Sequence, residues 1–115
     1  MNILVKIFLS SIAVIIASYL LPGVVVDGFI TAIIVAVLLA LLNSSVKPLL
    51  ILFTIPLTVF TLGLFLLVIN GLIILMADAI VPGFEVHGFW WALIFSLLLS
   101  LINALLTDLS KSDQK

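Results

Sequence analysis

Four apolar runs limit how this chain can fold more than any other feature of its sequence. Each run approaches the roughly 20 residues that a helix needs to cross about 30 Å of hydrocarbon. Hydrophobic residues make up 66% of the sequence and charged residues 8%, which is too little polar surface to cover a soluble domain. Lipid is therefore the expected solvent for most of the surface. The predicted transmembrane helices cover residues 3–21, 29–46, 61–80 and 89–107.

An internal repeat with a period of 60 residues is the second constraint. Residues 21–43 match residues 81–103 without a gap, and 11 of the 23 pairs are identical. Such a repeat indicates one supersecondary unit used twice. Each unit holds two predicted spans, an even number, so both units should have the same topology and be related by an axis along the membrane normal.

The sequence thus predicts an all-α integral membrane protein with four transmembrane helices, arranged as two parallel two-helix repeats in one domain. Its expected parts are repeat 1 (1–46), an apolar linker (47–60), repeat 2 (61–107) and a polar cytoplasmic tail (108–115).

Tight outer turns are expected between the two spans of each repeat, because proline cannot continue a helix and glycine accepts the positive φ of a terminating turn. The stretches 24–27 and 84–87 contain β-branched or aromatic residues, which favour extended backbone. We expect these two stretches to pair as short strands. The turn residues are Pro22, Gly23, Gly28, Pro82, Gly83 and Gly88.

The linker 47–60 is too apolar for an aqueous loop and too short to span a bilayer. Pro48 and Pro56 each remove a backbone donor, so a straight helix through both is costly. Three forms remain open: an interfacial helix, a re-entrant segment and a kinked extension of the third span.

Lysine placement predicts the orientation in the membrane. With four spans, all the lysines fall on one side, and neither Pro-Gly turn contains a lysine. Both termini are therefore expected in the cytoplasm. The lysines are Lys6, Lys47, Lys111 and Lys115.

Small residues recur at every fourth position on the second and fourth spans, and the two stripes coincide under the 60-residue shift. This spacing puts them on one face of each helix, and such faces let membrane helices approach closely. We expect the second and fourth spans to meet along these faces, within one protomer or between protomers. The stripes are Ala32, Ala36, Ala40 and Ser44, and Ala92, Ser96, Ser100 and Ala104.

Three asparagines lie in the predicted spans. Asn43 and Asn103 are equivalent residues near the cytoplasmic ends of the second and fourth spans. An amide there can bond to exposed carbonyls or to its mate, so we interpret both as structural. Asn70 lies near the centre of the third span beside Gly71. It could line a permeation path or form an interhelical hydrogen bond.

The sequence offers no constellation of catalytic residues. It contains no cysteine, no phosphate-binding loop and no nucleophile paired with a base, so we expect no enzyme activity and no cofactor. Asp27, Asp78, Glu85 and His87 gather on the predicted outer side, but one histidine with loop carboxylates is a weak constellation for a metal or a proton relay. A net charge of −1 offers no basic patch for nucleic acid. The expected partner is the lipid bilayer.

Short motifs spread over nearly the whole chain support a family resemblance. They are LPG with VDGF at 21–29, LLN with KP at 41–48, IPLT running into TLGLF at 55–65, VIN at 68–70, and VPGF with GF at 81–89. With these motifs the chain resembles the four-transmembrane phage holin superfamily IV. The resemblance implies a bacterial cytoplasmic-membrane protein that oligomerises into lesions, through which a phage endolysin escapes or the membrane depolarises.

Three functions are compatible with these features. The first is a small holin-like multi-pass protein that self-associates as a homo-oligomer in the bacterial inner membrane. The second is a non-lytic scaffold or accessory subunit of a bacterial envelope membrane complex. The third is a small-solute channel or transporter, which depends on Asn70 alone.

Overall fold

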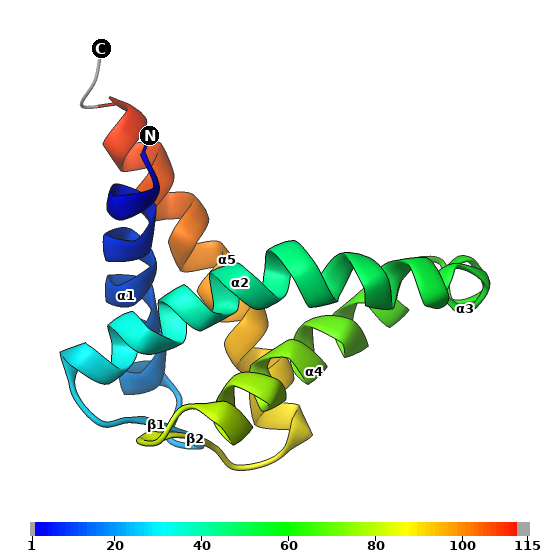
Figure 1. Cartoon of the computed structure of the whole chain (residues 1–115), viewed down its shortest axis with the longest axis horizontal. Coiled ribbons are helices and arrows are strands. Elements are labelled where there is room, and N and C mark those ends of the chain that lie inside the picture. Colours follow the sequence, from blue (N-terminus) through cyan, green and yellow to red (C-terminus); the bar gives the residue numbers. More distant parts are fainter. Residues whose placement is uncertain (1, 113–115) are drawn as a thin grey trace.

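The computed structural model describes residues 2–112, which form helices and one small β ribbon (Figure 1). Three helices are long and apolar enough to cross a membrane, and a fourth apolar helix is shorter, with 16 residues. This arrangement agrees with the predicted helical membrane fold. The elements are α1 (Ile3–Leu20), β1 (Val24–Val26), α2 (Phe29–Phe53), α3 (Ile55–Phe60), α4 (Phe65–Ile80), β2 (Phe84–Val86) and α5 (Phe89–Ser112).

The four longer helices form two arms that diverge from the β ribbon (Figure 1). Helices α1 and α5 pack together in one arm, and α2 and α4 pack together in the other. Near the ribbon, α1 also contacts α2, and α4 contacts α5. The start of α1 and the end of α5 lie at the far end of one arm, and α3 lies at the far end of the other.

The predicted direct contact between the second and fourth spans is wrong within one protomer. Within residues 2–112, no Cα atom of α2 comes within 8 Å of a Cα atom of α5, because each of these helices packs on α1 and α4 instead. Helices α1 and α4 also have buried small residues, Ala17 and Ala77 among them, so they too permit close approach. A stripe of small residues identifies a packing face but not the helix that covers it.

The β ribbon joins the two turns between helices, and the strand pairing predicted there is confirmed. Strands β1 and β2 are antiparallel, with Val25 opposite Glu85 at the centre of the ribbon. These two residues are 60 positions apart, so the register places equivalent residues of the repeat face to face. The remaining pairs are Val24 with Val86 and Val26 with Phe84.

Two further backbone hydrogen bonds extend the ribbon at its ends. The Asp27 N–H donates to the Gly83 carbonyl at 2.9 Å, and the His87 N–H donates to the Gly23 carbonyl at 2.8 Å. The two bonds are equivalent in the repeat, because Asp27 corresponds to His87 and Gly23 corresponds to Gly83. Equivalent backbone hydrogen bonds therefore connect the two turns.

The turn glycines are needed for two different reasons. Gly28, Gly83 and Gly88 have φ values of 93°, 88° and 116°, which residues with a Cβ rarely adopt. Gly23 is needed for space, because a Cβ added there would lie 2.2 Å from the Trp91 ring.

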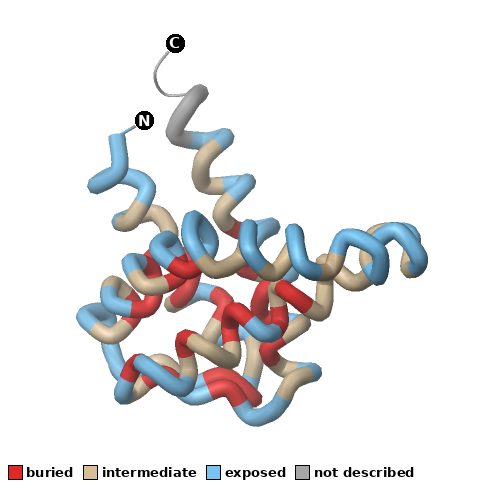
Figure 2. The backbone as a smooth tube through the Cα atoms, turned by 45° about the vertical axis from the view of Figure 1, so that its right-hand side comes forward, coloured by how far each residue is buried: buried red, intermediate tan, exposed pale blue. Residues whose placement is uncertain are grey.

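The core lies beside the ribbon and where the arms diverge, whereas the far ends of both arms are mostly exposed (Figure 2). Phe84 of β2 and Phe95 of α5 are buried there with their ring centroids 5.7 Å apart. Burial follows the sequence repeat: from residue 31 to residue 42, each position has the same degree of burial as the position 60 residues later. Equivalent parts of α2 and α5 thus have equivalent environments.

The first part of the linker continues the second span, and its last part forms the separate short helix α3. Helix α2 runs through Pro48 to Phe53 and does not end at residue 46. Pro48 removes the hydrogen bond to the Ser44 carbonyl, and its ring crowds that carbonyl. Ser44 is exposed, so the carbonyl does not lie in the core. Helix α3 follows with Pro56 in its first turn, where no intrahelical donor is required.

Helix α4 begins at Phe65, later than the predicted start at residue 61. Leu62 and Gly63 have φ values of 57° and 89°, which interrupt the helix and separate α3 from α4. The Phe65 N–H donates to the Thr61 hydroxyl at 3.1 Å and so helps to begin α4. Helix α5 differs at its other end, because it continues past the predicted end at residue 107 to Ser112.

Candidate functional site

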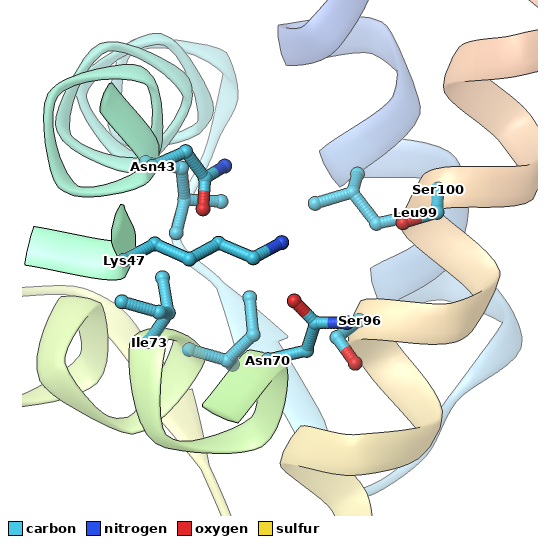
Figure 3. A pocket seen from close by; sticks show the side chains of 9 residues that line it. Asn43, Lys47, Asn70, Ile73, Ser96, Leu99 and Ser100 are labelled. Atoms are coloured by element: carbon cyan, nitrogen blue, oxygen red, sulfur yellow. The ribbon is translucent and has the colours of Figure 1, made fainter. Parts of the chain in front are cut away.

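A polar hollow of about 60 Å³ lies between α2, α4 and α5 (Figure 3). Ile73, Ile74 and Ser96 are buried on one side of the hollow, whereas Asn43 and Ser100 are exposed on the other. The hollow is therefore closed on one side and accessible on the other. Its lining residues are Leu39, Asn43, Lys47, Asn70, Ile73, Ile74, Ser96, Leu99 and Ser100.

Lys47 brings a positive charge into this hollow. It lies four residues after Asn43 on α2, so both side chains project from the same face of the helix. Figure 3 shows the lysine side chain extending across the hollow toward α5, with Asn70 below its amine. Lys47 is half-buried, and no carboxylate among the described side chains lies within 4.0 Å of its ammonium group.

Asn70 reaches the hollow from the second turn of α4. Its neighbour Gly71 is buried where α4 approaches the start of α5, and a Cβ on Gly71 would lie 2.8 Å from the Phe89 ring. Among residues 2–112, the Asn70 side chain takes part in none of the hydrogen bonds, so the predicted interhelical bond is not formed there. Its amide remains available to a group inside the hollow.

A second hollow of about 100 Å³ lies between α1, α2 and α5. Here the Ser10 hydroxyl donates a hydrogen bond of 3.3 Å to the Asn103 side-chain oxygen. Asn103 thus links α5 to α1, which supports its interpretation as a structural residue. The residues around this hollow are Ser10, Val14, Ala36, Leu39, Ala40, Asn43, Leu99 and Asn103.

The two hollows are counterparts under the 60-residue shift. Leu39 and Leu99 are equivalent residues, and both line both hollows. Asn43 also lines both, whereas its equivalent Asn103 lines only the second. The hollows therefore share a framework but differ in the polar groups that they present.

The structure divides each stripe of small residues into two parts. In the part near the ribbon the residues are buried, and in the part toward the far end of each arm they are exposed. The buried residues are Ala32, Ala36, Ala92 and Ser96, and the exposed residues are Ala40, Ser44, Ser100 and Ala104. Burial within one protomer therefore covers only half of each stripe, although Ala40 and Ser100 also line the hollows.

Two of the acidic residues near the turns, Asp78 and Glu85, have partners within the chain. The Val86 N–H donates to the Asp78 carboxylate at 3.2 Å, which connects the end of α4 to β2. His87 and Glu85 form an exposed pair with 3.8 Å between Nε2 and Oε2. In the part of the chain that the structure describes, no three histidine or acidic side chains are grouped as metal ligands would be.

Sequence reasoning missed the place of Lys47 in the hollow. It treated this lysine only as a marker of orientation, because the second span was expected to end one residue earlier. The spacing of four between Asn43 and Lys47 would have placed both on one helical face had the helix been extended through Pro48. Pro48 indicated a helix end before Lys47, so this spacing was not considered.

Comparison with known proteins identifies a family and two relatives. The family model described as mycobacterial four-transmembrane phage holin, superfamily IV, matches residues 1–105. The uncharacterised membrane protein YvlD of Bacillus subtilis is 41% identical over 93 residues, which cover 72% of this chain and 78% of the relative. The uncharacterised protein SCO3922 of Streptomyces coelicolor is 37% identical over 121 residues, which cover 93% of this chain and 97% of the relative. No solved structure matches the chain.

Proposed function

We propose that this chain, which belongs to the mycobacterial four-transmembrane phage holin family of superfamily IV, is a holin-like protein. In the proposal it self-associates in the bacterial cytoplasmic membrane. The observation that carries this proposal is the exposed half of each small-residue stripe. Because small residues let helices of separate protomers approach closely, the exposed ends of the stripes at Ser44 and Ala104, which line neither hollow, can pair with a second copy.

The apolar surface supports a location in lipid, where such pairing takes place. Large apolar side chains are exposed along both arms, and Leu62 and Phe60 retain 93% and 85% of their accessible surface. Exposing so much apolar surface to water is unfavourable for a protein of this size. A lipid bilayer accommodates it, and a neighbouring protomer can cover the part that carries the small residues.

The proposed topology has two parallel two-helix repeats with both termini in the cytoplasm. The lysine distribution supports this orientation, and the equal burial of residues 31–42 and 91–102 supports the repeat. We divide the chain into repeat 1 (1–46), linker (47–60) and repeat 2 (61–107), followed by the polar tail. The β ribbon then lies on the outer side, and α3 lies on the cytoplasmic side.

Leucine substitutions in the exposed half of each stripe test self-association. Ser44→Leu and Ala104→Leu add bulk without entering the protomer core, because both positions are exposed. Each should weaken association by about fivefold, the equivalent of about 1 kcal/mol for a helix contact in lipid. Förster transfer between labelled protomers in bilayers measures this effect. Ala79→Leu is the matched control, since Ala79 is exposed on α4 outside the stripes.

If both stripe variants associate as strongly as the Ala79→Leu control, the small residues do not form the contact between protomers. Membrane permeability requires a separate measurement. Controlled expression of a holin-like protein should collapse the membrane potential, as read by a potential-sensitive dye. Cells that keep their potential and growth rate with abundant protein in the membrane would contradict a lytic role.

A non-lytic subunit of an envelope complex is the second candidate. The exposed pair of Glu85 and His87 favours it, because the equivalent residues of the first turn are Val25 and Asp27. Only the second turn therefore presents an acidic residue beside a histidine. Extraction in a mild detergent separates the candidates. A second protein in constant stoichiometry supports the subunit, and a pure homo-oligomer opposes it.

A further inference from the structure

Four of the sequence differences between the two equivalent hollows place a more polar residue in the same hollow. Toward the hollow between α2, α4 and α5, the second repeat contributes Asn70, Ser96 and Ser100. The equivalent residues of the first repeat are Ser10, Ala36 and Ala40, which line the other hollow. The fourth difference is Lys47, whose equivalent is Thr107.

The polar hollow has hydrogen-bond donors and one positive charge but no acidic residue. Lys47 supplies an ammonium group, Asn43 and Asn70 supply amide N–H groups, and Ser96 and Ser100 supply hydroxyls. The Ser96 hydroxyl already donates to the Leu93 carbonyl at 2.8 Å. The half-buried Lys47 has no carboxylate within 4.0 Å among the described side chains, so its charge is open to an anionic ligand. The hollow therefore has the composition of an anion site.

We infer that this hollow binds a phosphate group, either in the headgroup of an anionic lipid or as free inorganic phosphate. The phosphate oxygens accept hydrogen bonds from the Lys47 ammonium, the two asparagine amides and the Ser100 hydroxyl. The single negative charge of a phosphodiester matches the single positive charge of Lys47. Basic hollows between transmembrane helices are known to hold lipid headgroups in this way.

Size and access agree with a phosphate ligand. A volume of about 60 Å³ is several times the roughly 10–15 Å³ that one water needs, so a group of several heavy atoms can enter. Asn43 and Ser100 are exposed at the open side of the hollow, and buried isoleucines close the other side. The inference rests on the membrane location of the chain and not on its self-association.

Lipid binding by purified full-length protein in a neutral detergent tests the inference. Native mass spectrometry measures the dissociation constant of phosphatidylglycerol for the wild type, Lys47→Gln, Lys47→Arg and Lys6→Gln. Lys47→Gln should bind about tenfold more weakly, since it loses a charge-assisted hydrogen bond. Lys47→Arg should retain binding, and Lys6→Gln is the charge-matched control because Lys6 is exposed outside both hollows.

A second experiment distinguishes the two sources of phosphate. Millimolar inorganic phosphate is added to lipid-free protein in detergent, and the thermal unfolding midpoint is compared with that in sulfate-free, phosphate-free buffer. A Lys47-dependent effect of phosphatidylglycerol alone assigns the hollow to a lipid headgroup, and a Lys47-dependent effect of inorganic phosphate assigns it to the free anion.

If neither ligand distinguishes Lys47→Gln from Lys6→Gln, the inference is wrong. Circular dichroism checks that the variants fold. Asn70→Ala provides a second test that keeps the charge, and it should weaken phosphate binding by a smaller factor. Equal binding by Asn70→Ala, Lys47→Gln and the wild type would also overturn the site.

Discussion

Replacing Gly23 with alanine should destabilise the protein through one identifiable clash. The added Cβ would lie 2.2 Å from Cδ2 of Trp91 and 2.3 Å from its Cε2 and Cγ atoms. Carbon atoms in good contact are about 3.5–4.0 Å apart, so the ring or the turn must move by more than about 1 Å. Trp91 packs against the hydrophobic core, and the Gly23 carbonyl accepts the His87 N–H. Both sides of the clash are therefore held in place.

We expect Gly23→Ala to lower the free energy of unfolding by about 2 kcal/mol. Overpacking a well-filled site costs about 1–3 kcal/mol, and contact with three ring atoms favours the upper half of this range. Less freedom in the unfolded chain offsets about 0.4–1 kcal/mol. Titration of the protein from mild detergent into sodium dodecyl sulfate, followed by far-ultraviolet circular dichroism, measures the change.

The repeat itself supplies the compensating substitution. At the equivalent site, Gly83 lies beside Thr31, which corresponds to Trp91 under the 60-residue shift. Trp91→Thr should therefore make room for the methyl group that Gly23→Ala adds, and the double variant should be more stable than the sum of the single effects predicts by about 1–2 kcal/mol. Gly28→Ala is the control. Its Cβ would meet no atom within 4 Å, so Trp91→Thr should not relieve the strain of its positive φ.

Additive effects of Gly23→Ala and Trp91→Thr, within about 0.5 kcal/mol, would refute the steric explanation. The same conclusion would follow if Gly23→Ala left the free energy of unfolding unchanged.

The polar contacts lead to two further expectations. Asn103→Leu removes the acceptor of the 3.3 Å bond from Ser10 and should lower the unfolding free energy by about 0.6–1 kcal/mol. Asn70→Leu breaks no hydrogen bond within residues 2–112, so it should leave the unfolding free energy unchanged or raise it. Equal losses in the same detergent titration would contradict this distinction. Asp78→Ala removes the acceptor of the Val86 N–H and should destabilise the ribbon by about 1 kcal/mol. Hydrogen exchange at the Val86 amide should then accelerate, and unchanged protection would show that the ribbon does not depend on this carboxylate.

Patterns that act locally were predictable from the sequence. Proline with glycine ended α1 and α4 where expected, and the β-branched turns formed the expected strands, because each depends on a few adjacent residues. The start of α4 was not predictable in this way. It depends on positive φ values at Leu62 and Gly63. Gly63 is a weak signal of such a break, but Leu62 gives none, because leucine rarely adopts this conformation.

Features that depend on distant partners were harder to predict. The spacing of small residues identified one face of α2 and α5 but not the helices that cover it. Lys47 was assigned to an aqueous boundary because Pro48 suggested that the helix had ended. The structure shows that α2 continues for five residues beyond Pro48, which the proline alone did not predict.

The register of the ribbon has a consequence for how such a chain can arise and diverge. Because Val25 lies opposite its own equivalent, two separate copies of one half could form the same ribbon, with valine facing valine. In such a homodimer every mutation would appear twice, and a lysine at position 47 would charge both hollows at once. Joining the halves in one gene removes that coupling. One hollow can then acquire a charge while the other keeps its hydrogen-bonded serine and asparagine. A fold built from two repeats can therefore contain a single asymmetric site.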